Sequence, residues 1–320
     1  MTSTLLNSTF ITLRFSGCGH LLPYHLGVST VLLEEESRRR PSNKPNRLIG
    51  PGVDTKIPKV KAVAGSSAGA IAAAMYSRLP HRLEEYASTF ISERGHALEI
   101  LKTMLHEEEN GSTTSSETLV TREKNSLPPS LHISATKCAD GSHHLFNFSP
   151  NLYPNISSCW ATDDILEAVK ASCSIPQSFH PADIVFKNQS LSYPNSEGVL
   201  IDDDYFVDGG IAAPAPSTPR DNQDGAHPII ISPISAGSRS LFFGEDDAPR
   251  RISPLDNSWR LLPISTLVCR GNFRVKPSIQ NLKAMRVASG MAASVELQEW
   301  YDLGVSDALR KLDEWSASSE

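Results

Sequence analysis

A five-residue glycine segment between a short strand and an alanine-rich helix constrains this chain more than any other feature. Residues 60–64 read as a strand, and residues 70–78 favour a helix because alanine loses no side-chain entropy. Between them, residues 65–69 (GSSAG) match the pattern G-x-S-x-G. A strand that enters and a helix that leaves are the context that a nucleophile elbow requires. The sequence therefore predicts a sharp turn with Ser67 at its apex.

The predicted turn gives Ser67 the setting of a nucleophile. Gly65 and Gly69 fit the turn because the neighbouring sheet and helix leave no room for larger side chains. Ser67 would lie at the helix N-terminus, whose partial positive charge favours a developing anion. The alternative is a glycine-rich strand-to-helix turn that holds only a buried serine.

A serine hydroxyl is a weak nucleophile and needs a base. Asp208 is the better candidate, because it ends the strand-like run YFV and precedes Gly209 and Gly210. These glycines let the chain turn tightly while the carboxylate projects from the sheet edge. The alternative is His227, which lies beyond the aspartates as a hydrolase triad requires but directly precedes the strand-like run PIIIS. A triad histidine should instead lie on a loop after the last strand.

Small residues also follow the first predicted strand, over residues 10–15. Gly17, Cys18 and Gly19 can expose successive backbone N–H groups, as an oxyanion site needs. The alternative is a phosphate-binding turn. The spacing disfavours it, because Leu22 stands where G-x-G-x-x-G needs its third glycine, and no G-K-[ST] follows.

Strands and helices alternate along the chain, which favours an α/β sheet covered on both faces. Asp140-Gly141 predicts a hairpin turn between strands. Residues 37–59 and 106–130 are polar and are interpreted as insertions. The remaining expected strands cover residues 131–138, 143–148, 199–207 and 228–232, and the expected helices cover residues 24–36, 81–105 (one or two), 162–174 and 276–312 (two).

Composition excludes several classes of protein. The net charge of -6 and the lack of a long basic stripe argue against nucleic-acid binding. Five cysteines without a C-x-x-C pair predict reduced thiols in a cytoplasmic protein, and no metal-ligand or cofactor motif is present. No apolar run approaches the length of a transmembrane helix, and residues 1–8 are too weakly apolar for a secretory signal.

Four segments, taken in order, resemble the patatin-like phospholipase family. They are LRFSGCGHLLPYHLGV (13–28), AVAGSSAGAIAAA (62–74), AVKASCSIPQSFHP (168–181) and VDGG (207–210). The first is similar to the G-C-G-x-x-x-x-Y-H-x-G-V form of the adipose-triglyceride-lipase branch. LVCRGNF (267–273) and YDLGVSDALRKL (301–312) look like further elements of that branch.

The resemblance implies a three-layer α/β/α sandwich with a mostly parallel central sheet and a Ser–Asp dyad that uses no histidine, metal or cofactor. Residues 9–235 would form the catalytic domain, and residues 236–320 a mainly helical C-terminal extension packed on it. Carried over residue by residue, the resemblance makes Ser67 the nucleophile and Asp208 the general base and later the proton donor. The oxyanion N–H groups would come from Gly17, Cys18 and Gly19. The glycines that support the motifs would be Gly65, Gly69, Gly209 and Gly210.

Three departures from the family pattern accompany this resemblance. Leu22 stands where the family usually has glycine, and His20 replaces an apolar residue. The segment IAAPAP (211–216) replaces an Asn-containing segment that could support Asp208.

The sequence thus predicts a serine acyl hydrolase that cleaves fatty-acyl esters of glycerolipids, as a triacylglycerol lipase or a phospholipase. It would work through an acyl-enzyme and visit a membrane or lipid-droplet surface transiently. The basic residues of the 38–47 loop would attract anionic head groups, and the alternative is that they form a solvated loop. The alternative is a catalytically silent patatin-fold protein that binds lipid or a protein partner. Leu22 and the IAAPAP segment are the features in its favour.

Overall fold

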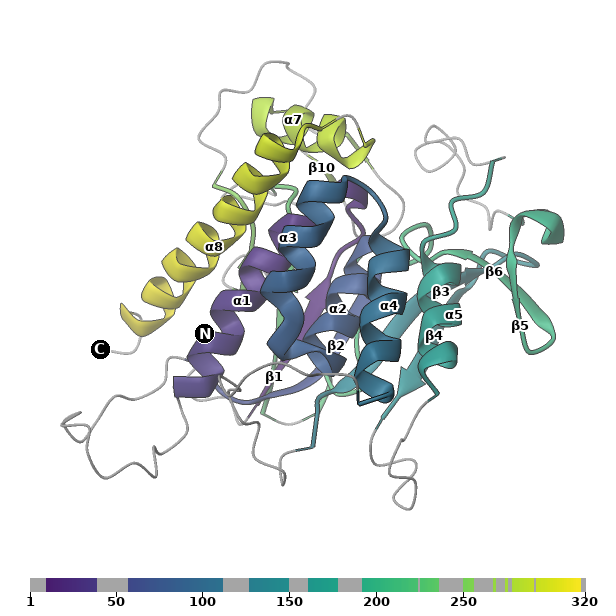
Figure 1. The fold of residues 1–320 in the computed structure, drawn as a ribbon, viewed down its shortest axis with the longest axis horizontal. Coiled ribbons are helices and arrows are strands. Elements are labelled where there is room, and N and C mark those ends of the chain that lie inside the picture. The colour runs from purple at the N-terminus through teal and green to yellow at the C-terminus, as the bar shows by residue number, and fades with distance from the viewer. Residues whose placement is uncertain are drawn as a thin grey trace.

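Strands with almost continuous burial form the centre of the molecule (Figure 1). β1 (Phe10–Phe15), β2 (Val60–Ser66) and β3 (Ser130–Lys137) are each buried at all but one position, the pattern of a sheet covered on both faces. The computed structural model describes residues 10–38, 57–111, 127–149, 161–177, 192–223, 225–235, 250–255, 267–268, 274–275, 278–290 and 292–317. Further strands are β4 (His143–Phe148), β5 (Val199–Ile201), β6 (Asp204–Asp208), β7 (Ala226–Ile231), β8 (Arg251–Ile252), β9 (Leu267–Val268) and β10 (Arg274–Val275).

The main sheet is mixed but mostly parallel, with the strand order β5-β6-β3-β2-β1-β7-β8 and β4 paired to β3. Helices lie on both sides, so the predicted α/β/α architecture is confirmed. The register places the candidate residues Ser67 and Asp208 at the same end of the strands. Ser66 stands opposite Ser134 of β3, and the next residue of β3, Ala135, stands opposite Asp208. Ser67 and Asp208 therefore reach the same end of the sheet.

The helices form where the sequence predicts them. Apolar residues and alanine dominate α1 and α2, and both helices are buried over most of their length. The 3-10 helices are η2 (Gly19–Leu21), η3 (Pro80–Arg82) and η4 (Asn195–Glu197), and the α-helices are α1 (Leu22–Arg38), α2 (Ala68–Arg78), α3 (Leu83–Glu93), α4 (Ala97–Glu109), α5 (Thr162–Ser172), α7 (Ile279–Ala288) and α8 (Ser294–Ala317).

Two expectations about local structure are corrected. The run 199–207 is not one strand but the hairpin of β5 and β6, because Asp202 takes a φ of 53° and reverses the chain. The predicted insertion at 106–130 begins too early, since α4 continues to Glu109. The hairpin at Asp140-Gly141 is confirmed, as β3 and β4 pair antiparallel. Most of the two insertions lies outside the described residues, and the boundary between domain and extension stays a prediction.

Two glycines let α8 pack directly on α1. A Cβ at Gly27 would lie 2.2 Å from the Tyr301 carbonyl oxygen, and a Cβ at Gly304 would lie 2.3 Å from that of Tyr24. Contacts below 3 Å are sterically forbidden, so each glycine admits the backbone of the opposite helix. The close crossing of these helices joins the C-terminal part of the chain to the first βαβ unit.

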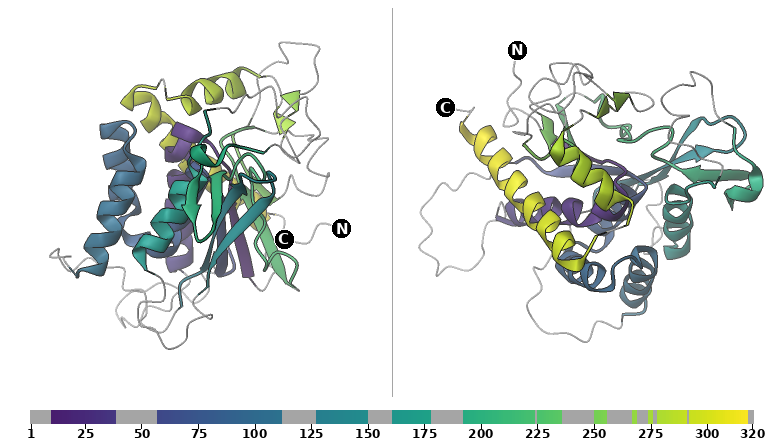
Figure 2. Two further views of the ribbon diagram at one scale, coloured as in Figure 1. Left: turned by 90° about the vertical axis from the view of Figure 1, so that its right-hand side faces the viewer. Right: turned by 90° about the horizontal axis from the view of Figure 1, so that it is seen from above.

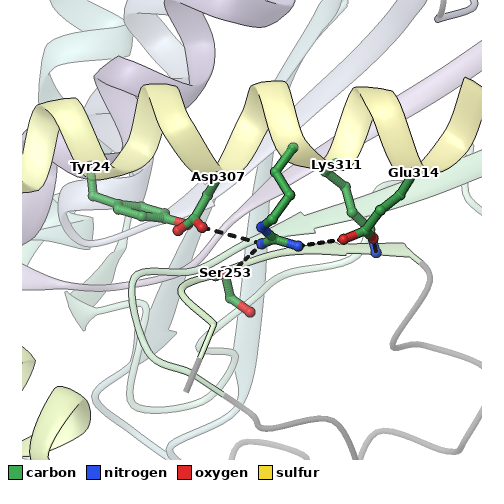
Figure 3. Close-up of polar contacts among 6 residues, drawn as sticks. Tyr24, Ser253, Asp307, Lys311 and Glu314 are labelled. Atoms are coloured by element: carbon green, nitrogen blue, oxygen red, sulfur yellow. Dashed lines mark hydrogen bonds and ion pairs between the residues drawn. The ribbon is translucent and has the colours of Figure 1, made fainter. Parts of the chain in front are cut away.

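Polar contacts secure the same crossing (Figure 3). The buried Tyr24 hydroxyl donates to Asp307 Oδ2 at 2.9 Å, which ties α1 to α8. Arg310 donates to Asp307 Oδ1 and to the carbonyl oxygen of Ser253, each at 3.2 Å, and so connects α8 to the segment after β8. Burial raises the pKa of Asp307, while the bonds from Tyr24 and Arg310 oppose that rise. The buried carboxyl group is therefore compensated by its partners.

We expect Gly304→Ala to destabilise the protein although alanine is the better helix former. The gain in helix propensity is about 1 kcal/mol, whereas overpacking against the Tyr24 backbone typically costs about 1–3 kcal/mol. Urea denaturation measures the difference, with Ser306→Ala at an exposed position of the same helix as the control. A Gly304→Ala protein as stable as the Ser306→Ala protein would contradict the close crossing.

Candidate active site

Ser67 has a strained backbone in the turn between β2 and α2. Its φ is 53° and its ψ is -131°, a conformation that residues with a side chain rarely adopt, and it is the N-cap of α2. The glycines around it are required by space. A Cβ at Gly65 would lie 2.0 Å from the Gly69 oxygen, and one at Gly69 would lie 2.5 Å from the Phe15 oxygen. The turn predicted from GSSAG is confirmed.

A buried serine from another element holds this turn. The Ser67 backbone N–H donates to Ser172 Oγ at 2.8 Å, and Ser172, the last residue of α5, is fully buried. The carbonyl oxygens of the same segment accept from the other candidate residues. Ser174 O accepts the Asp208 N–H at 2.8 Å, and Ser172 O accepts the Gly209 N–H at 3.2 Å. Residues 172–174 therefore fix the serine and the aspartate relative to each other.

Asp208 lies at the end of β6 and is 95% buried, with 5% of its surface exposed. Its Oδ1 accepts the backbone N–H of Gly210 at 2.7 Å, so the turn after the strand also orients the carboxylate. Burial raises the pKa of Asp208 from 3.8 to about 6, and the Ser67 hydroxyl and the Gly210 amide partly oppose this rise. A carboxyl group with that pKa is largely ionised at pH 7 and can still exchange a proton near neutrality.

The Asp208 carboxylate interacts with Ser67, and its second oxygen, Oδ2, is buried. The Ser67 hydroxyl acts on the carboxylate as a hydrogen-bond donor and lowers its pKa. Asp208 Oδ2 nevertheless has no partner of regular hydrogen-bond geometry among the described residues. We take the contact to be present but long, because catalytic hydrogen bonds are often loose in unliganded proteins and tighten on substrate binding. Oδ2 is the atom left available for a proton.

The turn over residues 17–19 lies directly beside Ser67. A Cβ at Gly17 would lie 3.4 Å from the Ser67 Cβ. The Gly17 N–H does not point freely into the site, because it donates to the Pro214 carbonyl oxygen at 2.9 Å. The same oxygen accepts from Ser66 Oγ at 2.7 Å. Of the three predicted oxyanion donors, Gly17 is thus engaged with the protein itself.

The two other predicted donors, Cys18 and Gly19, have free backbone N–H groups within the described residues. Gly19 takes a φ of +53°, and a Cβ there would lie 2.3 Å from the Ala288 oxygen of α7. Leu22 is right-handed helical and fully buried at the start of α1. The positive φ that this turn needs therefore falls on Gly19, and Leu22 in place of glycine distorts nothing.

The Cys18 thiol is packed rather than reactive. Burial is the main cause that raises the pKa of Cys18, and the nearby Cys173 raises it further. A thiol held in its protonated form is a poor nucleophile. Any role of Cys18 in the candidate site would therefore be expected from its backbone N–H group rather than from its thiol.

His227 lies away from the site. It stands opposite Ile11 of β1, whereas Phe15, four residues further along β1, stands opposite Gly65. Four strand residues span roughly 13 Å, so His227 belongs to the opposite end of the sheet. Burial lowers the pKa of His227 to about 4, which keeps it neutral. His227 is thus placed away from Ser67, and Asp208 as its base stays a prediction.

Sequence reasoning missed two residues of this arrangement, Ser172 and Pro214. Ser172 lies in the segment 168–181, which resembles the family, but nothing in the sequence around it indicates a hydrogen bond to Ser67. Pro214 lies in the segment IAAPAP (211–216), in which the sequence suggests the loss of a polar support for Asp208. Its carbonyl oxygen instead fixes Gly17 and Ser66, a role that any residue type could supply and that no sequence pattern marks.

Neither a metal site nor a membrane span emerges from the described residues. Within them, no group of three or more histidine, cysteine, aspartate or glutamate side chains is arranged to hold a metal ion. No helix in that part of the chain combines the length and the apolar content needed to cross a bilayer.

The raised pKa of Asp208 predicts that Asp208→Asn stabilises the protein near neutral pH. Since the folded-state pKa exceeds the unfolded one, the wild type loses stability as pH rises from about 4 to about 6. Two pH units correspond to roughly 3 kcal/mol, an upper estimate for the gain of the neutral variant at pH 7. Urea denaturation of both proteins at pH 4 and pH 7 gives the difference. The exposed Asp203→Asn control should show no comparable gain, and an equal gain in both variants would contradict the burial of Asp208.

Among solved structures, two chains with distant similarity to this protein are VipD and ExoU. VipD from Legionella pneumophila shares 11% identity with a TM-score of 0.36, over 96% of this chain and 67% of that chain. ExoU, solved with SpcU from the type III secretion system of Pseudomonas aeruginosa, shares 12% identity with a TM-score of 0.32. That match covers 96% of this chain and about half (52%) of ExoU's. No curated protein matches.

The family comparison covers the site itself. The family model of patatin-like phospholipases matches residues 13–219, which is more than half of the chain. The matched range includes the turn at residues 17–19, Ser67, the segment around Ser172, and Asp208. The chain belongs to the patatin-like phospholipase family.

Proposed function

We propose that this protein is a serine acyl hydrolase that cleaves fatty-acyl esters of glycerolipids with Ser67 and Asp208. The single observation that carries the proposal is the strained Ser67 backbone beside a buried carboxylate whose pKa is near 6. Strain is retained where the surroundings enforce it, and here Ser172, Gly65 and Gly69 do so. Membership of a lipid hydrolase family supports the lipid-ester substrate class.

In the first half-reaction, Ser67 Oγ attacks the ester carbonyl carbon while its proton passes to Asp208. The carbonyl oxygen becomes an oxyanion, which the N–H groups of Cys18 and Gly19 stabilise together with the positive end of α2. The tetrahedral intermediate then breaks its bond to the alcohol oxygen, which takes the proton from Asp208. The products of this stage are a free alcohol and an acyl group on Ser67.

In the second half-reaction, a water molecule attacks the acyl carbon and gives its proton to Asp208. The bond to Ser67 Oγ breaks, and Oγ regains the proton that Asp208 holds. A fatty acid leaves and both side chains return to their starting states. One carboxyl group serves as base and then as acid in each half, a role suited to a pKa near the working pH.

We further propose that the chain is of the triglyceride-lipase kind within its family. The support is that two segments that resemble this branch, residues 13–28 and residues 301–312, pack on each other. Tyr24 and Gly27 of the first segment contact Asp307 and Tyr301 of YDLGVSDALRKL. Residues that meet in this way form one structural unit, so the two segments belong together. Triacylglycerol and phospholipid both remain within the proposed substrate class.

The catalytically silent alternative predicts the same fold without turnover. Its two supporting features have structural roles that leave the site intact, since Leu22 lies in regular helix and Pro214 fixes the turn beside Ser67. We therefore favour hydrolysis. A measurement on Ser67 itself separates the two.

A fluorophosphonate probe should label wild-type protein at Ser67, and peptide mapping by mass spectrometry identifies the site. Ser67→Ala should lose labelling and lower the hydrolysis of a soluble nitrophenyl ester by roughly 10⁴-fold or more, because the nucleophile is gone. Ser77→Ala, at a serine of the same helix, is the control. Equal ester hydrolysis by wild type and Ser67→Ala would favour the silent protein.

Ser172→Ala tests the hydrogen bond that holds the elbow. We expect kcat to fall about ten- to a hundredfold with little change in KM, because the nucleophile is displaced while the substrate contacts remain. The ascending limb of the pH–rate profile should keep its midpoint near 6, since Asp208 is unchanged. Ser172→Thr, which retains a hydroxyl group, should restore part of the rate.

The matched control for Ser172→Ala is Ser174→Ala. The Ser174 hydroxyl donates to the Lys170 carbonyl oxygen, and its own carbonyl, which alanine keeps, accepts the Asp208 N–H. We expect near wild-type kcat for this variant. Equal losses in both variants, or a Ser172→Ala effect confined to KM, would contradict the positioning role.

A further inference from the structure

Helix α7 presents large apolar side chains to solvent. Ile279, Leu282 and Met285 follow one another every three residues and are 45%, 57% and 48% exposed. The opposite face, which includes Ala284 and Val287, is buried. A helix in a globular protein normally does the reverse and turns polar residues outward. Val295, at the start of α8, is also exposed (72%), and its neighbour Glu296 pairs with Arg286 of α7. We call these four residues the α7 patch.

The helix is held firmly in this orientation. Buried Asn281 accepts the Ser235 N–H through Oδ1 at 2.8 Å and donates through Nδ2 to the Ser235 carbonyl oxygen at 2.9 Å. Ser278 caps the helix N-terminus by accepting the Asn281 N–H at 3.0 Å. Rotating α7 to bury its apolar face would break these bonds and leave buried polar groups unpaired. The outward position of the apolar side chains is thus specified.

The charges on α7 are of one sign. The helix contains Lys283 and Arg286 and no acidic residue, in a chain whose net charge is -6. Both cations lie on the exposed side of the helix, next to the apolar residues. Arg286 pairs with Glu296 of α8, whereas Lys283 has no carboxylate partner among the described residues. An apolar strip flanked by cations complements a surface that is apolar inside and anionic at its rim.

The α7 patch is adjacent to the proposed oxyanion turn. The Ala288 oxygen of α7 touches Gly19 closely enough to exclude a Cβ. The turn after α7 packs on His20, since a Cβ at Gly290 would lie 3.0 Å from His20 Cε1. Figure 1 and the side view in Figure 2 place α7 at one extreme of the molecule, together with the start of α8. A surface that contacts α7 would therefore lie next to the site.

We infer that α7 is an interfacial docking helix, which inserts the α7 patch into a lipid surface and brings residues 17–19 and Ser67 to its lipids. The inference rests on the proposed lipid-ester hydrolysis and adds the element through which the protein reaches its substrate. Lipid is the favoured occupant because exposed apolar residues, the cation Lys283 and the turn at residues 17–19 meet at this helix. A second copy of the chain would not present an anionic rim by the same helix, since α7 has no acid.

The experiment measures the sedimentation of protein with vesicles. Ser67→Ala protein, which cannot consume the lipid, is mixed with phosphatidylcholine vesicles that contain or lack phosphatidylserine. Adding Leu282→Asp and Met285→Asp should weaken vesicle partitioning by about tenfold or more, because two apolar side chains no longer enter the interface. Leu309→Asp, at a leucine of α8 that is 50% exposed, is the matched control and should bind like the parent.

Two further measurements define the lipid contact. Lys283→Glu should weaken binding to phosphatidylserine-containing vesicles more than to pure phosphatidylcholine. With Ser67 intact, the Leu282→Asp/Met285→Asp protein should hydrolyse a soluble short-chain ester at the wild-type rate, while its hydrolysis of vesicle lipid falls with binding. The two proposals can fail separately. If the Leu282→Asp/Met285→Asp substitutions weaken vesicle binding but the wild type hydrolyses no ester, α7 docking is supported and the proposed hydrolysis is contradicted.

Two results would overturn the inference. One is a loss of binding in the Leu282→Asp/Met285→Asp protein no larger than that in Leu309→Asp. The other is a wild-type dimer in sedimentation velocity that the same double substitution dissociates, because a second copy would then cover the patch. Urea unfolding of each variant shows that the fold is retained, which is expected since the side chains of Leu282, Lys283, Met285 and Leu309 are exposed.

Discussion

The hydrogen bond from the Ser67 amide to Ser172 Oγ is the interaction on which the site depends. It satisfies the backbone of a residue with a positive φ, which would otherwise relax toward regular helix or strand geometry. The same short segment accepts the amides of Asp208 and Gly209. A single stretch of three residues at the end of α5 thus sets the distance between two groups that are 141 residues apart in sequence. The relative placement of Ser67 and Asp208 is a property of this junction more than of the GSSAG turn alone.

A second constraint is the crossing of α1 and α8, which carries the C-terminal residues back to the first helix. Gly27 and Gly304 allow the two backbones to touch, and Tyr24 and Asp307 bond inside the contact. Because α8 is fixed there, α7 is held against Gly19 with its apolar side outward. Helix packing far from Ser67 in sequence therefore supports both the turn at residues 17–19 and the surface beside it. In the proposed function, fold stability and access to lipid share these contacts.

Sequence patterns predicted much of this arrangement for physical reasons. Steric demands at Gly65 and Gly69 leave a readable signature, and the strand pattern before Asp208 places it at the sheet edge. Partners that act through backbone carbonyls, such as Pro214, leave no signature, because every residue has a carbonyl group. The turn at Asp202 was missed because three consecutive aspartates resemble a solvated edge as much as a reversal. Long-range hydrogen bonds, such as that of Ser172, need coordinates to be found.

The proposed mechanism requires a site that is arranged, before substrate binds, to stabilise the oxyanion that forms when Ser67 attacks an ester. The most direct measurement is a crystal structure of the protein after reaction with a fluorophosphonate. We expect phosphorus bonded to Ser67 Oγ, a phosphoryl oxygen within hydrogen-bond distance of the Cys18 and Gly19 amides, and the Ser67 amide still bonded to Ser172 Oγ. A phosphoryl oxygen directed away from residues 18–19, or a Ser67 with negative φ and no bond to Ser172, would contradict it.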